Sequence, residues 1–463
     1  MPCSASRQPL QQSLKQARSR LNERNCTLNS ISADSMNVLH ISAGYAPWVG
    51  GAQTYLREMS ERLVADGHRV TVVTSDIAEV DRAWSPRGRA AQTLRETING
   101  VDVIRCKVSH LPLAPHSFYA MRRLHTLIAP LAPQGLLRRL GEQVPPMPAL
   151  REAVMHAAQF ADILHAINIT FEHPVLRAAH AARHFNHPLV LTPFVHIGDA
   201  HVARNYLMPH QVALMQQADA LLAQTERERA ALCALGIHAD RVQVLGMGVN
   251  LNERDGADGD AFRAQHGIAQ QAPIVTFMGS LTYDKGAVHV LQAMPAVWRT
   301  RPDAVAVFAG EAPAPGGFDE AWRSVPQDRL ANVKLIGVVA GHTKQNLLAA
   351  TDVFAMPSRV DSFGIVFLEA WMHGKPVIGA DAGGVPDVIA HGKDGLIVPF
   401  GDLPALAQSI LQLIDDDAAR QTMGAAGRHK VELQFTWDSR YAVLRDLYLQ
   451  LHARAANRPS ISA

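Results

Sequence analysis

The sequence predicts an α/β protein that contains two doubly wound, Rossmann-like domains. Short apolar runs alternate with helix-like stretches, such as 53–65, through most of the 463 residues. This alternation is typical of a parallel sheet that is covered by helices on both faces. The pattern restarts after about residue 250, which predicts a second domain of the same kind.

Each predicted strand is a short apolar run bounded by polar or turn-forming residues. In the first half of the chain these runs are 37–43, 69–74, 101–105, 162–166, 188–192 and 219–224. In the second half they are 273–279, 304–309, 333–336, 352–356, 376–379 and 395–398. A Gly-rich stretch at 246–253 is the predicted linker. The predicted domains are therefore 36–245 and 246–430.

Composition argues against several classes of protein. The chain is 48% hydrophobic and 19% charged, with a net charge of +2, so we expect a globular protein that binds no nucleic acid. The cysteines are scattered, without a CxxC pair, so we expect neither a disulfide framework nor a structural zinc site. Because the sequence shows no membrane-length apolar run and no signal-peptide core, we expect a cytoplasmic location.

Two segments do not fit the alternating pattern. Residues 1–35 are polar and contain Arg7, Lys15 and Arg18. They are either a disordered leader before a true start at Met36, or a basic arm that touches anionic lipid. Residues 107–150 mix basic and apolar side chains. They form either a face that rests on a membrane or an irregular, solvated insertion.

The most informative segment follows the predicted strand 352–356. Asp361 and Glu369 lie eight residues apart, and a helix begins between them, near Phe363, Gly364 and Ile365. Free amides at the start of a helix bind phosphate well, and carboxylates accept hydrogen bonds from sugar hydroxyls. The segment therefore predicts a pocket for a sugar joined to a phosphate.

This segment resembles the E-x7-E signature of the retaining glycosyltransferases of family 4, the group 1 enzymes with a GT-B fold. The resemblance implies that the two domains face a central cleft, with the acceptor on the first and the nucleotide sugar on the second. It also implies that the helix 431–455 crosses back to the first domain, before a tail at 456–463. Asp361, in place of the usual Glu, would hold the donor sugar, and Glu369 would hold the ribose.

Other motifs match the same family pattern. Gly50 and Gly51 resemble its first-domain glycine loop, and His196 resembles its active-site histidine, with His165 and His201 as rivals. Lys285 matches the lysine that neutralises the leaving diphosphate. Ser280 departs from the pattern, because the family has arginine there. Glu311 is expected on the nucleotide side and 339–344 near the base, and 383–387 resembles the family's supporting segment.

The resemblance implies a retaining enzyme that moves a sugar from a nucleotide-sugar donor, UDP- or GDP-linked, to an acceptor hydroxyl. His196, Asp361 and Lys285 are the expected catalytic residues, and neither a metal nor another cofactor is expected. The expected acceptor is a glycan or a lipid-linked molecule, with peripheral membrane contact through 107–150. The alternatives are a sugar-nucleotide epimerase and a non-catalytic protein that binds sugar nucleotides.

Overall fold

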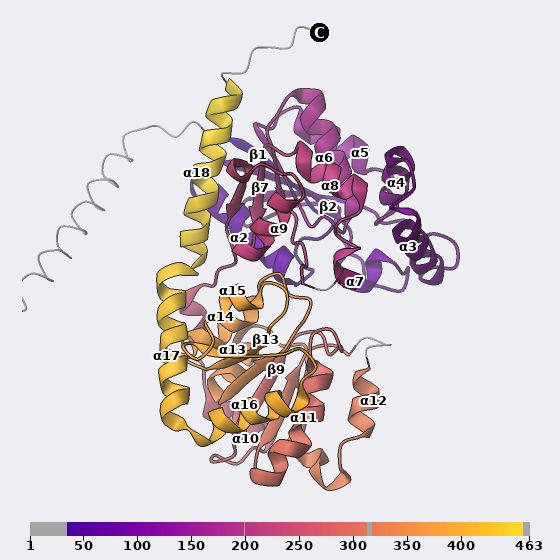
Figure 1. Ribbon diagram of the computed structural model, residues 1–463. Coiled ribbons are helices and arrows are strands. Elements are labelled where there is room, and N and C mark those ends of the chain that lie inside the picture. The colour runs from indigo at the N-terminus through magenta and orange to yellow at the C-terminus, as the bar shows by residue number, and fades with distance from the viewer. Residues whose placement is uncertain (1–34, 199, 313–316, 457–463) are drawn as a thin grey trace, which may run out of the picture. The chain divides into compact units, whose positions relative to one another are not determined.

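A computed structural model describes residues 35–198, 200–312 and 317–456 (Figure 1). The expectations for the leader and for the tail fall almost entirely outside these residues. The compact unit described below begins at Asn37.

The first domain is built on an eight-stranded sheet, with the strands in the order β3-β4-β2-β1-β5-β6-β7-β8. The strands are β1 (Asn37–Ile41), β2 (Arg69–Ser75), β3 (Arg95–Ile98), β4 (Val101–Cys106), β5 (Ile163–Ile167), β6 (Leu189–Thr192), β7 (Ala220–Ala223) and β8 (Val242–Val244). All neighbouring pairs are parallel except β3 and β4.

The second domain is built on a six-stranded parallel sheet, in the order β11-β10-β9-β12-β13-β14. The strands are β9 (Ile274–Met278), β10 (Val305–Ala309), β11 (Val333–Gly337), β12 (Val353–Met356), β13 (Val377–Ala380) and β14 (Gly395–Val398). The strand order reverses between β9 and β12, which is the point where doubly wound sheets bind ligands.

Helices connect the strands in both domains. In the first domain they are α2 (Gly51–Ala65), α3 (His116–Ile128), α4 (Gln134–Gly141), α5 (Leu150–Ala158), α6 (Glu172–Phe185), α7 (Ala200–Ala203), α8 (Pro209–Gln217) and α9 (Glu226–Ala234). In the second domain and after it they are α10 (Gly259–His266), α11 (Ala287–Thr300), α12 (Phe318–Arg323), α13 (Gly341–Ala350), α14 (Ile365–Met372), α15 (Val385–Val388), α16 (Leu403–Asp415), α17 (Asp417–Gln434) and α18 (Trp437–Ala456). Short 3-10 turns are η1 (Val80–Ala83), η2 (Ala239–Arg241), η3 (Leu251–Arg254) and η4 (Gln327–Asn332).

The predicted fold class is confirmed, and the predicted strands agree with the observed ones to within one or two residues. The prediction missed β3 and β8. Strand β3 forms an antiparallel hairpin with β4 through Asn99 and Gly100, which have φ of 49° and 82°. An Asn-Gly pair with two positive φ angles is the strongest short-range hairpin signal. The sequence therefore carried this signal, although the hairpin was not predicted.

The segment 107–150 is not irregular, because it contains the helices α3 and α4. Within the described residues, no helix is long and apolar enough to cross a membrane.

Helix α18 packs against α2 and β5 of the first domain. Its Tyr448 hydroxyl lies 2.6 Å from Nδ1 of His165 and 3.1 Å from Nε2 of His40, and all three side chains are fully buried. Burial lowers the pKa of His40 to about 3 and that of His165 well below its usual value. Both histidines are therefore neutral in this network. The network ties the end of the chain to the middle of the first sheet.

Candidate functional site

The candidate site lies where the loops after β9 and β12 meet. Lys285 follows β9 and Asp361 follows β12, and the Lys285 ammonium lies 2.9 Å from Oδ1 of Asp361. Because β9 and β12 flank the point where the strand order reverses, their carboxyl ends open at the same place on the sheet edge. The sheet topology therefore brings together two predicted residues that are 76 positions apart in the chain.

Close backbone packing fixes these loops. Gly286, with φ of 86°, approaches Pro357 so closely that a Cβ would lie 2.4 Å from the Pro357 carbonyl oxygen. Gly383, with φ of 56°, approaches Asp361 in the same way, again at 2.4 Å from a carbonyl oxygen. The amide of Gly384 donates to the Asp361 carbonyl at 2.9 Å. Only glycine accepts both the positive φ and the close approach, so the 383–387 segment supports the Asp361 loop.

Asp361 is charged and only partly satisfied. Burial by itself would raise its pKa, but the Lys285 ammonium, the Ser358 hydroxyl and His196 together outweigh that effect, so the pKa of Asp361 is lowered. Its second oxygen, Oδ2, is buried and has no hydrogen-bond partner among the described residues. A buried carboxylate oxygen without a partner is costly, so Oδ2 is well placed to accept a hydrogen bond from a ligand hydroxyl.

His196 belongs to the loop after β6 in the first domain. Burial and the charge of Lys285 lower its pKa to about 4, although Asp361 acts in the opposite direction. The His196 ring is therefore neutral at neutral pH, and it lies close enough to the Lys285–Asp361 pair to sense both charges. In the same loop, a Cβ on Gly198 would lie 2.9 Å from the Gly383 amide nitrogen, which brings this loop against the second domain.

Tyr206 holds His196 in place and was not predicted. Its hydroxyl lies 3.0 Å from Nδ1 of His196, and the two rings stack with centroids 4.7 Å apart. Burial and, to a lesser degree, Asp361 raise the pKa of Tyr206, so the hydroxyl keeps its proton. Tyr206 follows His196 by ten residues without a local motif, so no sequence pattern pointed to it.

Of the two rival histidines, His165 does not join this group. His165 donates to or accepts from Thr192 and Tyr448 in the buried network of α18. The side chain of His201 lies outside the described part of the chain.

Helix α14 presents its N-terminus beside Asp361. Gly364, with φ of 86°, is the N-cap of this helix. The described residues of its first turn include no acidic side chain. The first amides of a helix lack internal partners and carry partial positive charge. Phe363 is buried, with its ring 5.6 Å from that of Phe435. Phe363 and Ile365 therefore offer their backbone amides, rather than their side chains, to an anion.

Glu369 lies in the second turn of α14 and has a cationic partner. Lys344 of α13 lies 2.8 Å from Oε1 of Glu369 and 3.8 Å from Oε2 of Glu253. Burial would lower the pKa of Lys344, but Glu369 and Glu253 together outweigh that effect, so the pKa is raised. Lys344 belongs to the segment that was expected near the base, and its direct contact with Glu369 was not predicted.

The remaining predicted residues surround this pair less closely. Gly50 precedes α2 as its N-cap, and Gly51 is the first residue of the helix. Gly51 is exposed, and a Cβ at this position would meet only the Met247 side chain, at 3.7 Å. Ser280 and Glu311 are exposed. The Glu311 carbonyl accepts from the Leu281 amide at 2.7 Å, which joins the loops after β10 and β9. None of these four described residues forms a hydrogen bond or an ion pair with Lys285 or Asp361.

Ser280 carries no charge at the position where the family pattern has arginine. Arg359 supplies a cation in the loop after β12, but its guanidinium is 2.7 Å from Oδ1 of Asp284. It also lies over the rings of Tyr283 and Phe400, at 5.6 and 5.2 Å. Arg359 is therefore engaged by the β9 loop itself.

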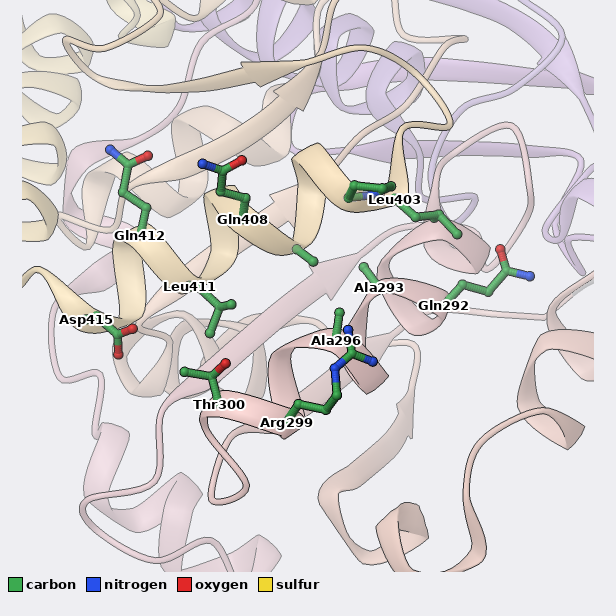
Figure 2. Close-up of a pocket in the computed structure, with 12 residues that line it drawn as sticks. Gln292, Ala293, Ala296, Arg299, Thr300, Leu403, Gln408, Leu411, Gln412 and Asp415 are labelled. Carbon is green, nitrogen blue, oxygen red and sulfur yellow. The ribbon is translucent and has the colours of Figure 1, made fainter.

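A separate cavity of about 630 Å³ lies between α11 and α16 (Figure 2). Its lining comes only from these two helices and includes Gln292, Arg299 and Gln408. None of the predicted site residues contributes to it, so we do not assign the chemistry to this cavity.

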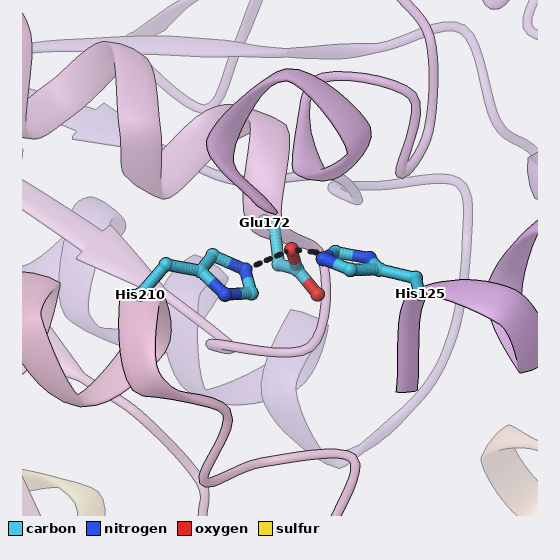
Figure 3. A group of neighbouring side chains, drawn as sticks. All are labelled: His125, Glu172 and His210. Atoms are coloured by element: carbon cyan, nitrogen blue, oxygen red, sulfur yellow. Dashed lines mark hydrogen bonds and ion pairs between the residues drawn. The ribbon is translucent and has the colours of Figure 1, made fainter. Parts of the chain in front are cut away.

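One buried group has the composition of a metal site. His125, Glu172 and His210 place their donor atoms within 4.8 Å of one another (Figure 3). However, Glu172 is already ion-paired with Arg122 and accepts from Gln211 at 3.1 Å. Glu172 is the only carboxylate of this group, and Arg122 already neutralises its charge, so no metal ion is needed for that purpose. Burial lowers the pKa of His125 to about 4.

Replacing Lys285 by Met should destabilise the protein by about 1–3 kcal/mol at neutral pH, because a buried carboxylate then lacks its partner. The lowered pKa of Asp361 contributes stability above the usual carboxyl pKa of about 3.9. In Lys285→Met, burial without the ammonium raises this pKa, so the difference between wild type and variant should shrink as the pH falls towards and then below the usual value. Chemical denaturation from pH 3 to pH 8 measures this difference.

Arg89→Met is the matched control, because its pair with Glu79 is mostly exposed and exposed pairs contribute little. A stability difference for Lys285→Met that did not change with pH would show that Asp361 does not depend on the ammonium.

Two family models match the chain. The model for the glycosyl transferase 4-like domain matches residues 50–248, and the model for glycosyl transferases group 1 matches residues 258–430. A GDP-mannose-dependent phosphatidylinositol monomannoside mannosyltransferase of Corynebacterium glutamicum is 35% identical over 188 residues, which is 39% of this chain and 48% of that protein. Glycogen synthase of Mycobacterium tuberculosis is 26% identical over 89% of this chain and 94% of that protein.

Solved structures show the same fold. HepE of Anabaena, crystallised with UDP, has a TM-score of 0.67 at 20% identity and matches over 90% of this chain and 100% of that chain. Sucrose-phosphate synthase of Thermosynechococcus elongatus has a TM-score of 0.68 at 22% identity, with the same coverage. The two family models together span both Rossmann-like domains, and the chain belongs to the group 1 glycosyl transferases, which are family 4-type glycosyltransferases with a GT-B fold.

Proposed function

We propose that this glycosyltransferase moves a sugar from a nucleotide-sugar donor to an acceptor hydroxyl and keeps the anomeric configuration. The observation that carries the proposal is the Lys285–Asp361 pair at the strand-order reversal. It offers a cation for a leaving phosphate and, in Oδ2 of Asp361, an unused acceptor for a sugar hydroxyl.

Charge on the leaving diphosphate is handled by Lys285 and by the amides at the start of α14. Both are fixed before the donor binds, which makes their electrostatic stabilisation effective. The bond between the anomeric carbon and the phosphate oxygen breaks, and the acceptor oxygen attacks from the same face. The acceptor proton passes to the departing phosphate. These steps use no metal ion and no cofactor.

His196 positions the reacting groups in this scheme. With a pKa of about 4, it is neutral at the pH of the reaction and adds no charge beside Lys285. Tyr206 bonds to Nδ1 of His196, which leaves Nε2 for the substrate. On the nucleotide side, Glu369 holds the ribose hydroxyls, and Lys344 orients Glu369 through their ion pair.

The proposed donor is a hexose linked to UDP or GDP. Two named proteins support these two bases: HepE was crystallised with UDP-glucose, and the Corynebacterium glutamicum relative is GDP-mannose-dependent. The acceptor is a glycan or a lipid-linked molecule, and the reaction belongs to glycan, exopolysaccharide or glycolipid synthesis.

Thermal unfolding in the presence of UDP, GDP and their sugar conjugates tests the donor. A ligand at about 100 times its dissociation constant should add ~2.7 kcal/mol to stability, so one nucleotide should raise the melting temperature clearly. Proton NMR of the product should then show the anomeric configuration of the donor. Inversion would contradict the retaining mechanism, and tight nucleotide binding without turnover on any acceptor would contradict a transferase.

The two carboxylates should separate in their effects. Glu369→Ala should weaken binding of the bare nucleotide by about tenfold or more, because a hydrogen bond to a charged group contributes ~1.5–3 kcal/mol. Asp361→Ala should leave nucleotide binding nearly unchanged and lower the rate of transfer. Calorimetric titration with the nucleotide and initial rates measure the two effects, with Glu152→Ala on α5 as an exposed control. Equal losses of binding in both variants would contradict the assigned roles.

We also propose that α3 and α4 rest on a membrane surface. Leu113, Leu127 and Leu131 are 86%, 77% and 93% exposed, and Arg123 and Arg139 are exposed on the same two helices. Apolar and basic side chains together are typical of a helix at an anionic lipid interface.

Co-sedimentation with phosphatidylglycerol vesicles measures this contact. Several-fold less of the double variant Leu127→Ser/Leu131→Ser should sediment with the vesicles. Leu433→Ser, at a leucine outside this segment that is 64% exposed, should sediment as wild type does. Unchanged binding of the double variant would contradict membrane contact through α3 and α4.

A further inference from the structure

A groove of about 750 Å³ runs between α3 and the connection from α7 to α8. One wall follows helical spacing along a single face of α3 and continues just past its end. The lining residues are Tyr119, Arg122, Arg123, Thr126, Leu127, Ala129 and Pro130 on this wall, and Arg204, Asn205, Leu207, Met208 and Pro209 on the other. None of the catalytic or donor-binding residues named above lies in this groove.

The groove is cationic. Arg123 and Arg204 face it from opposite walls and are exposed. Neither forms an ion pair with another described residue, and no described residue of the lining is acidic. Guanidinium groups match the geometry of phosphate oxygens and bind them through charge-assisted hydrogen bonds. The groove therefore favours a phosphate over a neutral sugar.

Arg122 is the third arginine in the lining. Its charge is already neutralised by an ion pair, so it holds the wall of the groove in place instead of attracting a ligand. Its guanidinium is ion-paired with Glu172, which also accepts from Nε2 of His210 at 2.6 Å (Figure 3). Because Glu172 is on α6 and His210 is on α8, this buried cluster joins α3 to the body of the domain.

Asn205 joins the two walls directly. Its carbonyl accepts from Nε2 of Gln211 at 2.9 Å and from Nη2 of Arg122 at 3.5 Å. Its side chain accepts from the Thr126 hydroxyl at 3.4 Å. The walls are thus held at a fixed spacing before any ligand binds, which lowers the cost of binding.

The rest of the lining is apolar. Leu127, Leu207, Met208 and Pro130 line the groove beside the arginines, and the strongly exposed Leu131 follows directly along the chain. A free phosphate ion would leave this apolar surface uncovered. A molecule that carries both a phosphate and an acyl or prenyl chain would cover both parts.

The groove leads to the candidate site through one residue. Tyr206 lies between Asn205 and Leu207, which both line the groove, and it bonds to His196. The same short connection therefore carries Arg204, which lines the groove, and the residue that orients His196.

We infer that this groove binds the phosphate of a lipid-linked acceptor and presents the acceptor hydroxyl towards His196. This inference rests on the proposed function, because it assigns the acceptor of that reaction. It identifies Arg123 and Arg204 as residues that determine acceptor specificity.

Calorimetric titration with dihexanoyl phosphatidylglycerol below its micelle concentration tests the inference. The full chain is first saturated with UDP or GDP, so that the probe does not bind near Lys285. The double variant Arg123→Gln/Arg204→Gln should bind the probe about tenfold more weakly or worse, because one charge-assisted hydrogen bond is enough for such a change. Arg151→Gln, at an exposed arginine on α5 outside both the groove lining and the proposed membrane face, should bind as wild type.

Two further probes separate the sources of the phosphate. Inorganic phosphate should bind much more weakly than the lipid, and octyl glucoside should not distinguish wild type from the double variant. If inorganic phosphate binds as tightly as the lipid, a free phosphate is the ligand and the lipid assignment is overturned. Equal binding of the lipid by wild type and the double variant, or no binding by wild type, would overturn the groove as a phosphate site.

Donor hydrolysis without acceptor, measured on the same proteins, separates this inference from the proposed function. The double variant should hydrolyse the donor at the wild-type rate, since both arginines are exposed and lie outside the donor site. Absence of nucleotide binding in wild type would overturn the proposed transfer while leaving the groove measurement intact.

Discussion

The ion pair between Lys285 and Asp361 is the interaction on which the candidate site depends. The 2.9 Å contact between these side chains joins the loop after β9 to the loop after β12, at the point where the strand order reverses. It keeps Asp361 ionised in a buried position, and it leaves one carboxylate oxygen without a partner. The surrounding loops, the start of α14 and His196 are all arranged around these two charges.

Backbone geometry gives this pair its precision. The glycines at 286, 364 and 383 have positive φ angles, and each lies where a side chain would collide with a neighbouring loop or ring. Such contacts need no charge or polarity, yet they fix where the charged groups lie. An ion pair on mobile loops would contribute little, whereas loops held by main-chain contacts present a preorganised field to a ligand.

Two buried polar networks connect distant parts of the chain. Tyr448 ties α18 to the first sheet through His40 and His165, and Glu172 gathers Arg122, His210 and Gln211 where α3, α6 and α8 meet. Each places several polar groups where water is excluded, so their mutual hydrogen bonds are needed to offset desolvation. The second network also builds one wall of the arginine-lined groove beside Tyr206.

The sequence by itself determined the fold class, the approximate strand limits and the pairing of a loop carboxylate with a helix start near Phe363. These properties depend on local periodicity and on spacing within one strand-loop-helix unit, which can be read along the chain. The Asn99-Gly100 hairpin was equally local and was missed although its signal was present. Only the tertiary structure decided that Lys285 meets Asp361, that Lys344 meets Glu369 and that Tyr206 meets His196. Those contacts depend on strand order and helix packing, because residues far apart in sequence have no shared local pattern to reveal them.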